Sequence, residues 1–356
     1  MRAVAVTPHV KDSARMLRVP DIHPGAEEAL VRLLRVGVCG TDRELNEGLY
    51  GEAPPGEEFL IIGHESLGRV EAVGSKVQGL WPGELVVATV RRPDDCPNCK
   101  MGEYDMCLWG GYTERGIKGR HGFMAEFYVE EPQYLVKVPE ELEDVAVLLE
   151  PLSVVEKAVS QSFKIQDRMA WQPERALVLG AGTIGLLAAA LLRLRGLEVH
   201  IFGRRCLPPK AELMEMMEAK YLCDEEGPLP ALGERLGHID LIIEATGSSA
   251  LAFQALRLLG NNGVLCLTGI QGGHRTLEIE SDLINREMVL GNKVAFGTVN
   301  ANRKYFEMGI SHMKVIKARW PGLLSRMITR RLSLDDWAQA LRVDPEGIKT
   351  VIECQR

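Results

Sequence analysis

Side chains that commonly bind metal ions occur in three short segments of the first 151 residues. They are Cys39, His64, Glu65 and Glu150. Thiolate, imidazole and carboxylate form a zinc ligand set, and three protein ligands leave a fourth position open for catalysis. Each residue alone has a simpler explanation, because a lone cysteine is usually a small buried side chain, a His–Glu pair is usually exposed, and a glutamate can begin a helix. A fold that brings the segments together would make them a catalytic zinc site.

A second cluster, Cys96, Cys99 and Cys107, has the spacing C-x2-C-x7-C. Clustered cysteines in a chain without a secretion signal favour a metal over disulfides. Asp94 or Asp95 could complete a tetrahedral zinc site, since zinc accepts carboxylate oxygen. The alternative is a loop of three reduced thiols without metal. The other cysteines are scattered along the chain, namely Cys39, Cys206, Cys223, Cys266 and Cys354.

A glycine-rich turn follows the apolar run at 176–179. It reads Gly-Ala-Gly-Thr-Ile-Gly over 180–185 and is followed by the apolar stretch 186–192. This order predicts a strand, a tight turn and a helix, in which the glycines let the backbone approach a pyrophosphate at the helix N-terminus. A G-x-G-x-x-G sequence alone is a weak signal, but the strand before it and the helix after it supply the required context. The segment therefore predicts dinucleotide binding.

The next apolar stretch, 199–202, ends in Gly203, Arg204 and Arg205. An NAD site usually has a carboxylate about 20 residues beyond the glycines, where it bonds the ribose 2′-hydroxyl. Two arginines follow the second strand here instead, and a guanidinium can bond a phosphate through two N–H groups. The alternative is an exposed arginine pair after an ordinary strand. We predict NADP as the cofactor, with NAD possible.

Further apolar strands at 241–245 and 263–267 end in turns of small residues. Alternating strands and helices predict a parallel sheet that binds its ligand at the carboxyl ends of the strands. The predicted cofactor contacts are Gly180, Gly182, Thr183, Ile184, Gly185, Leu186, Gly203, Arg204, Arg205, Thr246, Thr268, Gly269, Ile270, Thr298, Val299 and Asn300.

The chain is expected to be an α/β protein of two domains. Residues 1–150 are rich in predicted strands, with half-exposed examples at 31–36 and 68–73, and a linking helix follows at 151–163. We expect a β-rich catalytic domain at 1–150, completed by 295–356. The segment 151–294 is then a Rossmann domain with a doubly wound parallel sheet.

Composition excludes several classes of protein. Of the 356 residues 46% are hydrophobic and 26% charged, as in ordinary globular proteins. The net charge of −7 without a basic tract argues against nucleic acid as the main partner. The longest apolar stretch contains three glycines and is shorter than the roughly 20 residues of a membrane span. The N-terminus resembles a first strand and not a signal peptide, so a cytoplasmic location is expected.

Several of these segments together resemble a known enzyme family. The pattern Cys39-Gly40-Thr41-Asp42 and Gly63-His64-Glu65 resembles the zinc-binding pattern of medium-chain alcohol dehydrogenases. The segments 89–93, 114–117, 121–124, 134–139 and above all 150–158 resemble the archaeal-type glucose 1-dehydrogenases of that superfamily. The resemblance covers essentially the whole chain, and it implies that the β-rich catalytic domain is GroES-like.

The resemblance implies roles for the metal-binding segments. It implies a catalytic zinc held by Cys39, His64 and a carboxylate, either Glu150 or Glu65, with a choice that can change during the catalytic cycle. Asp42 would orient His64 through its other ring nitrogen. The superfamily also has a structural zinc lobe with four cysteines, but Pro93 stands here where the first cysteine would be.

The same resemblance implies oxidation of an aldose, most of all D-glucose, at C1 to the lactone with NADP⁺. Thr41 would contact the sugar and the proton path, and Glu114, Glu150 and Asn300 would contact sugar hydroxyls. Thr41, Glu65 and Glu150 are the expected catalytic residues. The alternatives are another zinc-dependent polyol, alcohol or amino-alcohol dehydrogenase, or a non-enzymatic NADPH-binding protein on the same fold. A homo-oligomer, a dimer or tetramer, is expected.

Overall fold

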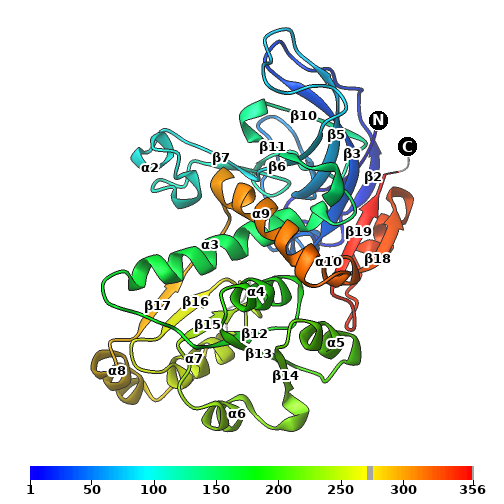
Figure 1. Ribbon diagram of the computed structural model, residues 1–356. Helices are drawn as coiled ribbons and strands as arrows, with labels where there is room; N and C mark the ends of the chain where they lie inside the picture. Colours follow the sequence, from blue (N-terminus) through cyan, green and yellow to red (C-terminus); the bar gives the residue numbers. More distant parts are fainter. Residues whose placement is uncertain (271–275, 355–356) are drawn as a thin grey trace. The chain divides into compact units, whose positions relative to one another are not determined.

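The computed structural model describes residues 1–270 and 276–354 and divides the chain into two units (Figure 1). Unit 1 comprises Met1–Ser153, Asn300–Lys314 and Leu324–Arg356, and unit 2 comprises Val154–Val299 and Val315–Leu323. Helices α3 (Leu149–Gln166) and α9 (Arg303–Arg319) each contribute residues to both units.

Unit 1 is built mainly from antiparallel strands. Its largest sheet has the order β11-β6-β5-β3-β19-β18, with β10 also paired to β3, and smaller sheets join β2-β1-β4 and β7-β8-β9. The strands are β1 (Arg2–Val6), β2 (Arg15–Arg18), β3 (Ala29–Val38), β4 (Leu60–Ile61), β5 (Glu65–Val73), β6 (Leu85–Ala88), β7 (Arg91–Arg92), β8 (Thr113–Arg115), β9 (Gly119–Arg120), β10 (Phe127–Glu130), β11 (Leu135–Val138), β18 (Ile328–Ser333) and β19 (Lys349–Glu353). The shorter helices are α1 (Gly40–Asn46), α2 (Pro97–Lys100), α10 (Leu323–Met327) and α11 (Trp337–Ala340).

The central strand β3 shows why this sheet has one buried face. Ala29, Val31 and Leu33 alternate with more exposed residues and belong to the main apolar cluster of the unit. Successive side chains of a strand point to opposite faces, so this alternation places one face in the core. The last strand β19 pairs with β3 on the side opposite β5, so the end of the chain completes the sheet begun by its first part.

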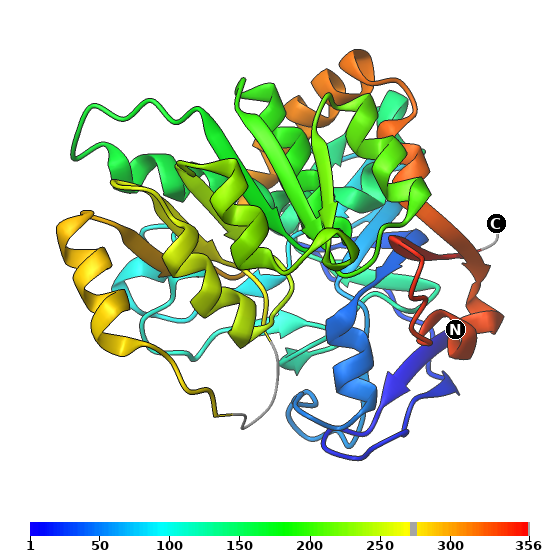
Figure 2. The ribbon, with the colours of Figure 1, turned by 90° about the horizontal axis from the view of Figure 1, so that it is seen from below.

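Unit 2 contains a parallel sheet with the order β14-β13-β12-β15-β16-β17. Residues 176–179 of β12 and all residues of β15 are buried, as expected when helices cover both faces. In Figure 2 the green and yellow-green helices run alongside these strands. The strands are β12 (Arg175–Leu179), β13 (Glu198–Gly203), β14 (Lys220–Cys223), β15 (Leu241–Glu244), β16 (Val264–Leu267) and β17 (Val294–Gly297), and the helices are α4 (Thr183–Leu194), α5 (Pro208–Met216), α6 (Leu229–Leu236), α7 (Ser249–Leu258) and α8 (Ser281–Leu290).

The predicted fold class, a β-rich GroES-like part plus a doubly wound parallel sheet, is confirmed. Two strands of the parallel sheet were not predicted, β14 and β17, because both are short and only partly buried. The expected domain boundary at residue 294 lies inside β17, whereas unit 2 continues to Val299. No helix within the described residues is long and apolar enough to span a membrane.

Candidate active site and cofactor site

Three metal-binding side chains of unit 1 meet in one place. Ligand atoms of Cys39, His64 and Glu65 all lie within 4.8 Å of one another, and Cys39 Sγ is 3.3 Å from His64 Nε2. Zinc bonds of about 2.0–2.3 Å in tetrahedral geometry separate neighbouring ligand atoms by roughly 3.5 Å. His64 and Glu65 are buried, and the three atoms are sulfur, nitrogen and oxygen. Their spacing and chemistry therefore fit a zinc ion with an open fourth position.

Asp42 holds the two ligand-bearing segments together. Its Oδ2 accepts a hydrogen bond from the Cys39 amide at the start of α1, and its Oδ1 accepts one from the Gly63 amide. Gly63 has a φ of +87°, which favours glycine, and this turn places His64. Asp42 Oδ1 lies 3.8 Å from His64 Nδ1, the ring nitrogen opposite the one that faces Cys39. This distance is too long for a hydrogen bond, and His64 Nδ1 has no hydrogen-bond partner among the described residues, so the fully buried carboxylate acts on the imidazole through its charge.

The charge around His64 is also suited to a cation. Burial lowers the pKa of His64, but the charges of Cys39 and Asp42 outweigh burial and raise it well above its usual value. A buried site with this excess of negative charge favours a bound positive ion. The protein therefore provides both the ligand geometry and the electrostatic environment that zinc requires.

A lysine from the last strand pairs with the site carboxylate. Lys349 Nζ forms a buried ion pair with Glu65, because β19 and β5 flank β3 on opposite sides. A Cβ at Gly37, which lies opposite Glu65 in β3, would clash with Glu65 Oε2, so a glycine is needed for the pair to meet. Burial disfavours the charged lysine, but Glu65 raises its pKa. Sequence reasoning missed Lys349, since no local pattern connects it to residue 65.

Glu150, at the second position of α3, lies beside this cluster. It is not one of the three residues grouped within 4.8 Å in the part of the chain described. The pKa of Glu150 is raised to about 7, mainly by burial. The charge of His64 lowers this pKa, and the charge of Glu65 raises it further. The geometry thus favours Glu65 as the carboxylate nearest to the other ligands, with Glu150 close enough to interact electrostatically with both.

Thr41 occupies the first turn of α1, two residues after Cys39. Thr41 lies close enough to the Tyr50 hydroxyl to lower the pKa of that group, although burial raises the pKa overall. The Tyr50 hydroxyl in turn donates to Glu44 Oε2 at 2.9 Å. A chain of exchangeable protons therefore leads away from Thr41, and Tyr50 and Glu44 are members that sequence reasoning did not include.

Glu114 and Asn300, predicted on separate segments, are in direct contact. Asn300 Nδ2 donates to Glu114 Oε1 at 2.9 Å. The Arg91 guanidinium donates to the same oxygen through Nε and Nη2, at 3.1 and 3.0 Å, and stacks over the Tyr112 ring. None of the hydrogen bonds found among residues 1–270 and 276–354 uses Oε2 of Glu114, so that oxygen is available to a ligand hydroxyl. Arg91 was not predicted.

The second cysteine cluster includes a specific aspartate. Ligand atoms of Asp94, Cys96, Cys99 and Cys107 lie within 4.8 Å of one another. The Cys107 thiol donates to Asp94 Oδ2 at 3.0 Å and holds the pKa of that carboxyl below its usual range. Of the two aspartates left open by the sequence, the structure brings Asp94 into the cluster. One oxygen and three sulfurs suit a structural zinc.

Replacing Asp94 with alanine should release one zinc per chain and lower the melting temperature by several degrees, because removing a zinc ligand weakens a site that stabilises its loop. Elemental analysis and thermal unfolding would check this. The matched control is Asp95→Ala, which changes an exposed neighbour outside the cluster and should alter neither quantity. Equal zinc content in both variants would contradict the assignment.

In unit 2 the predicted cofactor residues gather at one edge of the sheet. Because β12, β13, β15, β16 and β17 are parallel, their carboxyl ends all lie on that edge. A Cβ at Gly185 would clash with the Gly180 carbonyl, so the first turn of α4 can pack against the turn only with glycine there. Gly180 itself has a φ of +107°. The residues that directly follow the strand ends are Gly180, Arg204, Thr268 and Thr298, with Thr246 two residues after β15.

Three predicted cofactor residues differ in their surroundings. Arg204 and Arg205 are exposed in the short loop between β13 and α5, where both guanidinium groups can reach a ligand. Leu186 is buried, and its amide already donates to the Gly182 carbonyl inside α4. This arrangement favours helix packing over ligand contact for Leu186.

Buried charged residues organise the loops at this edge. The Glu244 carboxylate at the end of β15 accepts hydrogen bonds from the Thr246 and Gly247 amides. Lys157 of α3 donates to the Val299 carbonyl at 3.0 Å in the loop after β17. Neither residue was predicted to take part in the site. An acidic residue at a strand end and a lysine in an apolar helix are the signals that could have suggested them.

Two family models match the chain, and together they cover most of it. The model described as "Alcohol dehydrogenase GroES-like domain" matches residues 25–140, and the one described as "Glucose dehydrogenase C-terminus" matches residues 143–354. The matched ranges include the metal-binding cluster of Cys39, His64 and Glu65, the cluster of Asp94 and the three cysteines, and the predicted cofactor residues.

The chain is also similar over its full length to curated proteins and to a solved structure. It is 51% identical to the "Glucose 1-dehydrogenase" of Methanocella arvoryzae, covering 99% of each chain. It is 43% identical to the "Glucose 1-dehydrogenase" of Thermoproteus tenax, covering 100% of each. A structure described as Haloferax mediterranei glucose dehydrogenase in complex with NADP, Zn and gluconolactone superposes with a TM-score of 0.92 at 35% identity, covering 100% of both chains.

Proposed function

This chain belongs to the glucose 1-dehydrogenase family of GroES-like alcohol dehydrogenases, and we propose that it oxidises D-glucose at C1 to the lactone with NADP⁺ and zinc. One observation carries the proposal above the others. Ligand atoms of Cys39, His64 and Glu65 lie within 4.8 Å of one another, in a chain whose second unit has the parallel sheet of a dinucleotide-binding domain. A protein that only binds NADPH has no need of an open metal position.

Cys39, His64 and Glu65 would hold the zinc, and Arg204 and Arg205 would bond the 2′-phosphate of NADP. When bound, zinc polarises the C1 oxygen as a Lewis acid and the nicotinamide accepts the C1 hydrogen as hydride. The protein's own task is to bind and orient the sugar and to conduct its proton.

Thr41 would accept the proton of the C1 hydroxyl at its Oγ1. Its contact with Tyr50, which in turn donates to Glu44 Oε2, provides a path by which that proton can leave a buried site. Hydroxyls suit this role because each can donate one hydrogen bond and accept another. This supports Thr41 as a catalytic residue that relays a proton.

Glu114 and Asn300 supply recognition of the sugar. Arg91 and Asn300 hold Glu114 through Oε1, so its Oε2 is oriented as an acceptor for a sugar hydroxyl. A buried site that satisfies hydroxyl donors rejects substrates without them, since its polar groups would be left unpaired. This favours an aldose over a simple alcohol as the substrate.

Glu150→Gln tests this function. Wild-type enzyme should produce one gluconolactone per NADPH formed from glucose. Glutamine keeps the shape and one acceptor oxygen but removes a charge from the site, so kcat/KM for glucose should fall by about a hundredfold. The KM for NADP⁺ should change little, because the predicted contacts of the cofactor lie on other loops. Assays with galactose, xylose, polyols and simple alcohols define the substrate class.

Unchanged turnover of Glu150→Gln would show that Glu65 alone supplies the carboxylate function. Faster oxidation of a polyol or a simple alcohol than of any aldose by the wild-type enzyme would replace the proposal by the alternative, another zinc-dependent dehydrogenase of this fold.

A homo-oligomer and a cytoplasmic location are further parts of the proposal. β17 is the last strand of its sheet within the described residues, and the end of α8 beside it exposes Val289 and Leu290 at 67% and 75%. An edge strand with neighbouring apolar side chains is suited to pairing with a second copy. The free thiols of Cys39, Cys96, Cys99 and Cys107 support a reducing compartment, since zinc binds thiolates and not disulfides.

A further inference from the structure

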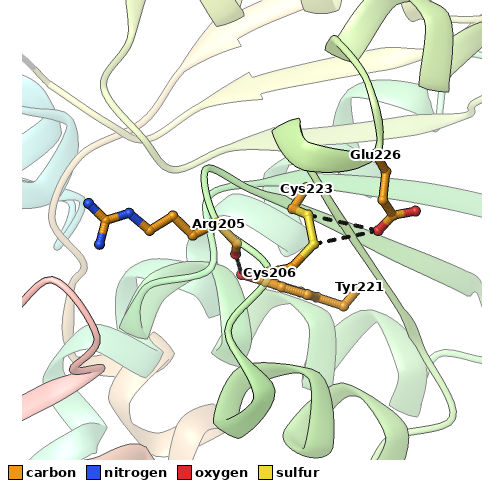
Figure 3. Close-up of a disulfide and its surroundings, with 5 residues drawn as sticks. All are labelled: Arg205, Cys206, Tyr221, Cys223 and Glu226. Carbon is orange, nitrogen blue, oxygen red and sulfur yellow. Dashed lines mark hydrogen bonds between the residues drawn. A yellow bond between two sulfur atoms is a disulfide. The ribbon is translucent and has the colours of Figure 1, made fainter.

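A disulfide lies directly beside the arginines assigned to cofactor selection. It joins Cys206 and Cys223, whose Cα atoms are 5.5 Å apart (Figure 3). Cys206 follows Arg205 in the loop after β13, and Cys223 is the last residue of β14. The other six cysteines, all within the described residues, are free. A disulfide is unusual in a protein that otherwise keeps its thiols reduced, so its position calls for an explanation.

The disulfide and a hydrogen bond from Tyr221 both link this loop to β14. β13 and β14 are parallel, with Gly203 opposite Cys223. The Tyr221 hydroxyl, also from β14, donates to the Arg205 carbonyl at 2.8 Å. A Cβ at Gly203 would clash with that hydroxyl, so the glycine makes room for the second link. The backbone is therefore held at residues 205 and 206, immediately after the first arginine.

The side chain of Arg205 remains available to a ligand. Figure 3 shows it pointing away from the disulfide, and both Arg204 and Arg205 are exposed. A loop already fixed in shape loses less conformational entropy when it binds a phosphate than a free loop does. The lower entropic cost strengthens the binding of a ligand only if that ligand contacts the arginines. It therefore strengthens the binding of NADP and not that of NAD.

We propose that Cys206, Cys223 and Tyr221 are positioning residues for cofactor selection, and that the disulfide makes preference for NADP dependent on redox state. The proposal rests on the proposed function, in which Arg204 and Arg205 bond the 2′-phosphate. The oxidised enzyme binds NADP more tightly than the reduced enzyme, while NAD binds equally to both.

The redox step is an exchange with an external dithiol. A thiolate of the dithiol attacks the exposed Cys206 sulfur, the bond to Cys223 breaks, and the dithiol closes to its own disulfide. Two electrons and two protons pass to the protein, which then carries two thiols. Glu226 Oε1 lies 3.8 and 3.9 Å from the two sulfurs, where it can accept hydrogen bonds from those thiols. Reduction therefore removes the covalent link to β14, while the hydrogen bond from Tyr221 to the Arg205 carbonyl remains.

The test compares air-oxidised and dithiothreitol-reduced holoenzyme. Thiol titration of denatured enzyme with a chelator should give six thiols before reduction and eight after it. Reduction should raise the KM for NADP⁺ by about tenfold, with kcat and the KM for NAD⁺ within twofold, because only the arginine contacts lose their pre-organisation. Tyr221→Phe, which keeps the ring, should raise the KM for NADP⁺ further in the reduced enzyme.

Cys206→Ser is the matched control, since it alters an exposed side chain and removes the disulfide permanently. Its KM for NADP⁺ should equal that of the reduced wild type and should not respond to dithiothreitol, which separates loop effects from loss of zinc to the dithiol. The inference is overturned if the enzyme has eight thiols before reduction. It is also overturned if the ratio of the KM for NADP⁺ to the KM for NAD⁺ is the same in the oxidised enzyme, the reduced enzyme and Cys206→Ser. If Arg204→Ala/Arg205→Ala loses NADP preference in that case, the cofactor assignment stands; if it keeps the preference, both fail.

Discussion

Cys39→Ser should reduce kcat/KM for glucose by at least about a thousandfold, because metal polarisation of a reacting oxygen contributes several kcal/mol to the transition state. Serine removes the thiolate that lies 3.3 Å from His64 Nε2 and leaves the fold of α1 in place. The bound zinc should fall by one per chain. Steady-state kinetics with parallel elemental analysis give both quantities, and circular dichroism checks that the variant is folded.

The control for Cys39→Ser is the same substitution at another free cysteine. Cys354 is half-buried, belongs to the same unit and lies outside both metal-binding clusters. Cys354→Ser should keep full activity and full zinc content. If Cys39→Ser retained its zinc and its turnover, the residues grouped in unit 1 would not be the catalytic metal site.

Arg204→Ala/Arg205→Ala should raise the KM for NADP⁺ by about a hundredfold, since hydrogen bonds between charged groups each contribute about 1.5–3 kcal/mol. The KM for NAD⁺ should stay within twofold, because NAD has no 2′-phosphate for the arginines to bond. The enzyme would then prefer NAD⁺. Initial rates with each cofactor at saturating glucose measure this change directly.

Arg235→Ala provides the comparison for this double variant. Arg235 is exposed on α6 of the same unit and is not part of the predicted cofactor edge. It reports the effect of losing one surface charge, which should be small for both cofactors. Equal losses for NADP⁺ and NAD⁺ in the double variant would contradict the assignment of the arginines to the 2′-phosphate.

The dinucleotide edge could be predicted from the sequence because its signals are local. A strand, a G-x-G-x-x-G turn and a helix follow one another within about 20 residues, and the second strand ends directly before Arg204. Parallel pairing then carries the turns of the other strands to the same edge. β14 was not predicted, because this short and partly exposed strand has no clear apolar run in the sequence.

The metal site could be predicted only in part. Cys39 and His64 can be recognised as metal ligands from their residue types. The contact between Lys349 and Glu65, in contrast, depends on the pairing of β19 and β5 with β3. Such a contact depends on strand register and on the missing side chain of Gly37, which no spacing along the chain reveals.

The disulfide could not be predicted from the sequence either, because its two cysteines are far apart along the chain and belong to no cysteine cluster. Cys206 and Cys223 are 17 residues apart, with α5 between them. They meet because β14 returns parallel to β13 and ends beside Gly203. Cysteine spacing predicts metal ligands in one loop much better than pairs joined by a crossover helix.

The most direct test of zinc-dependent glucose oxidation is the zinc dependence of NADPH formation by the wild-type enzyme. Zinc is removed with a chelator, the chelator is dialysed away, and zinc is returned in measured steps while NADPH and gluconolactone are followed. The rate should fall to background in the zinc-depleted enzyme and return in proportion to zinc bound at Cys39, His64 and Glu65, with one lactone formed per NADPH. Full activity in enzyme that contains no bound metal would contradict the account.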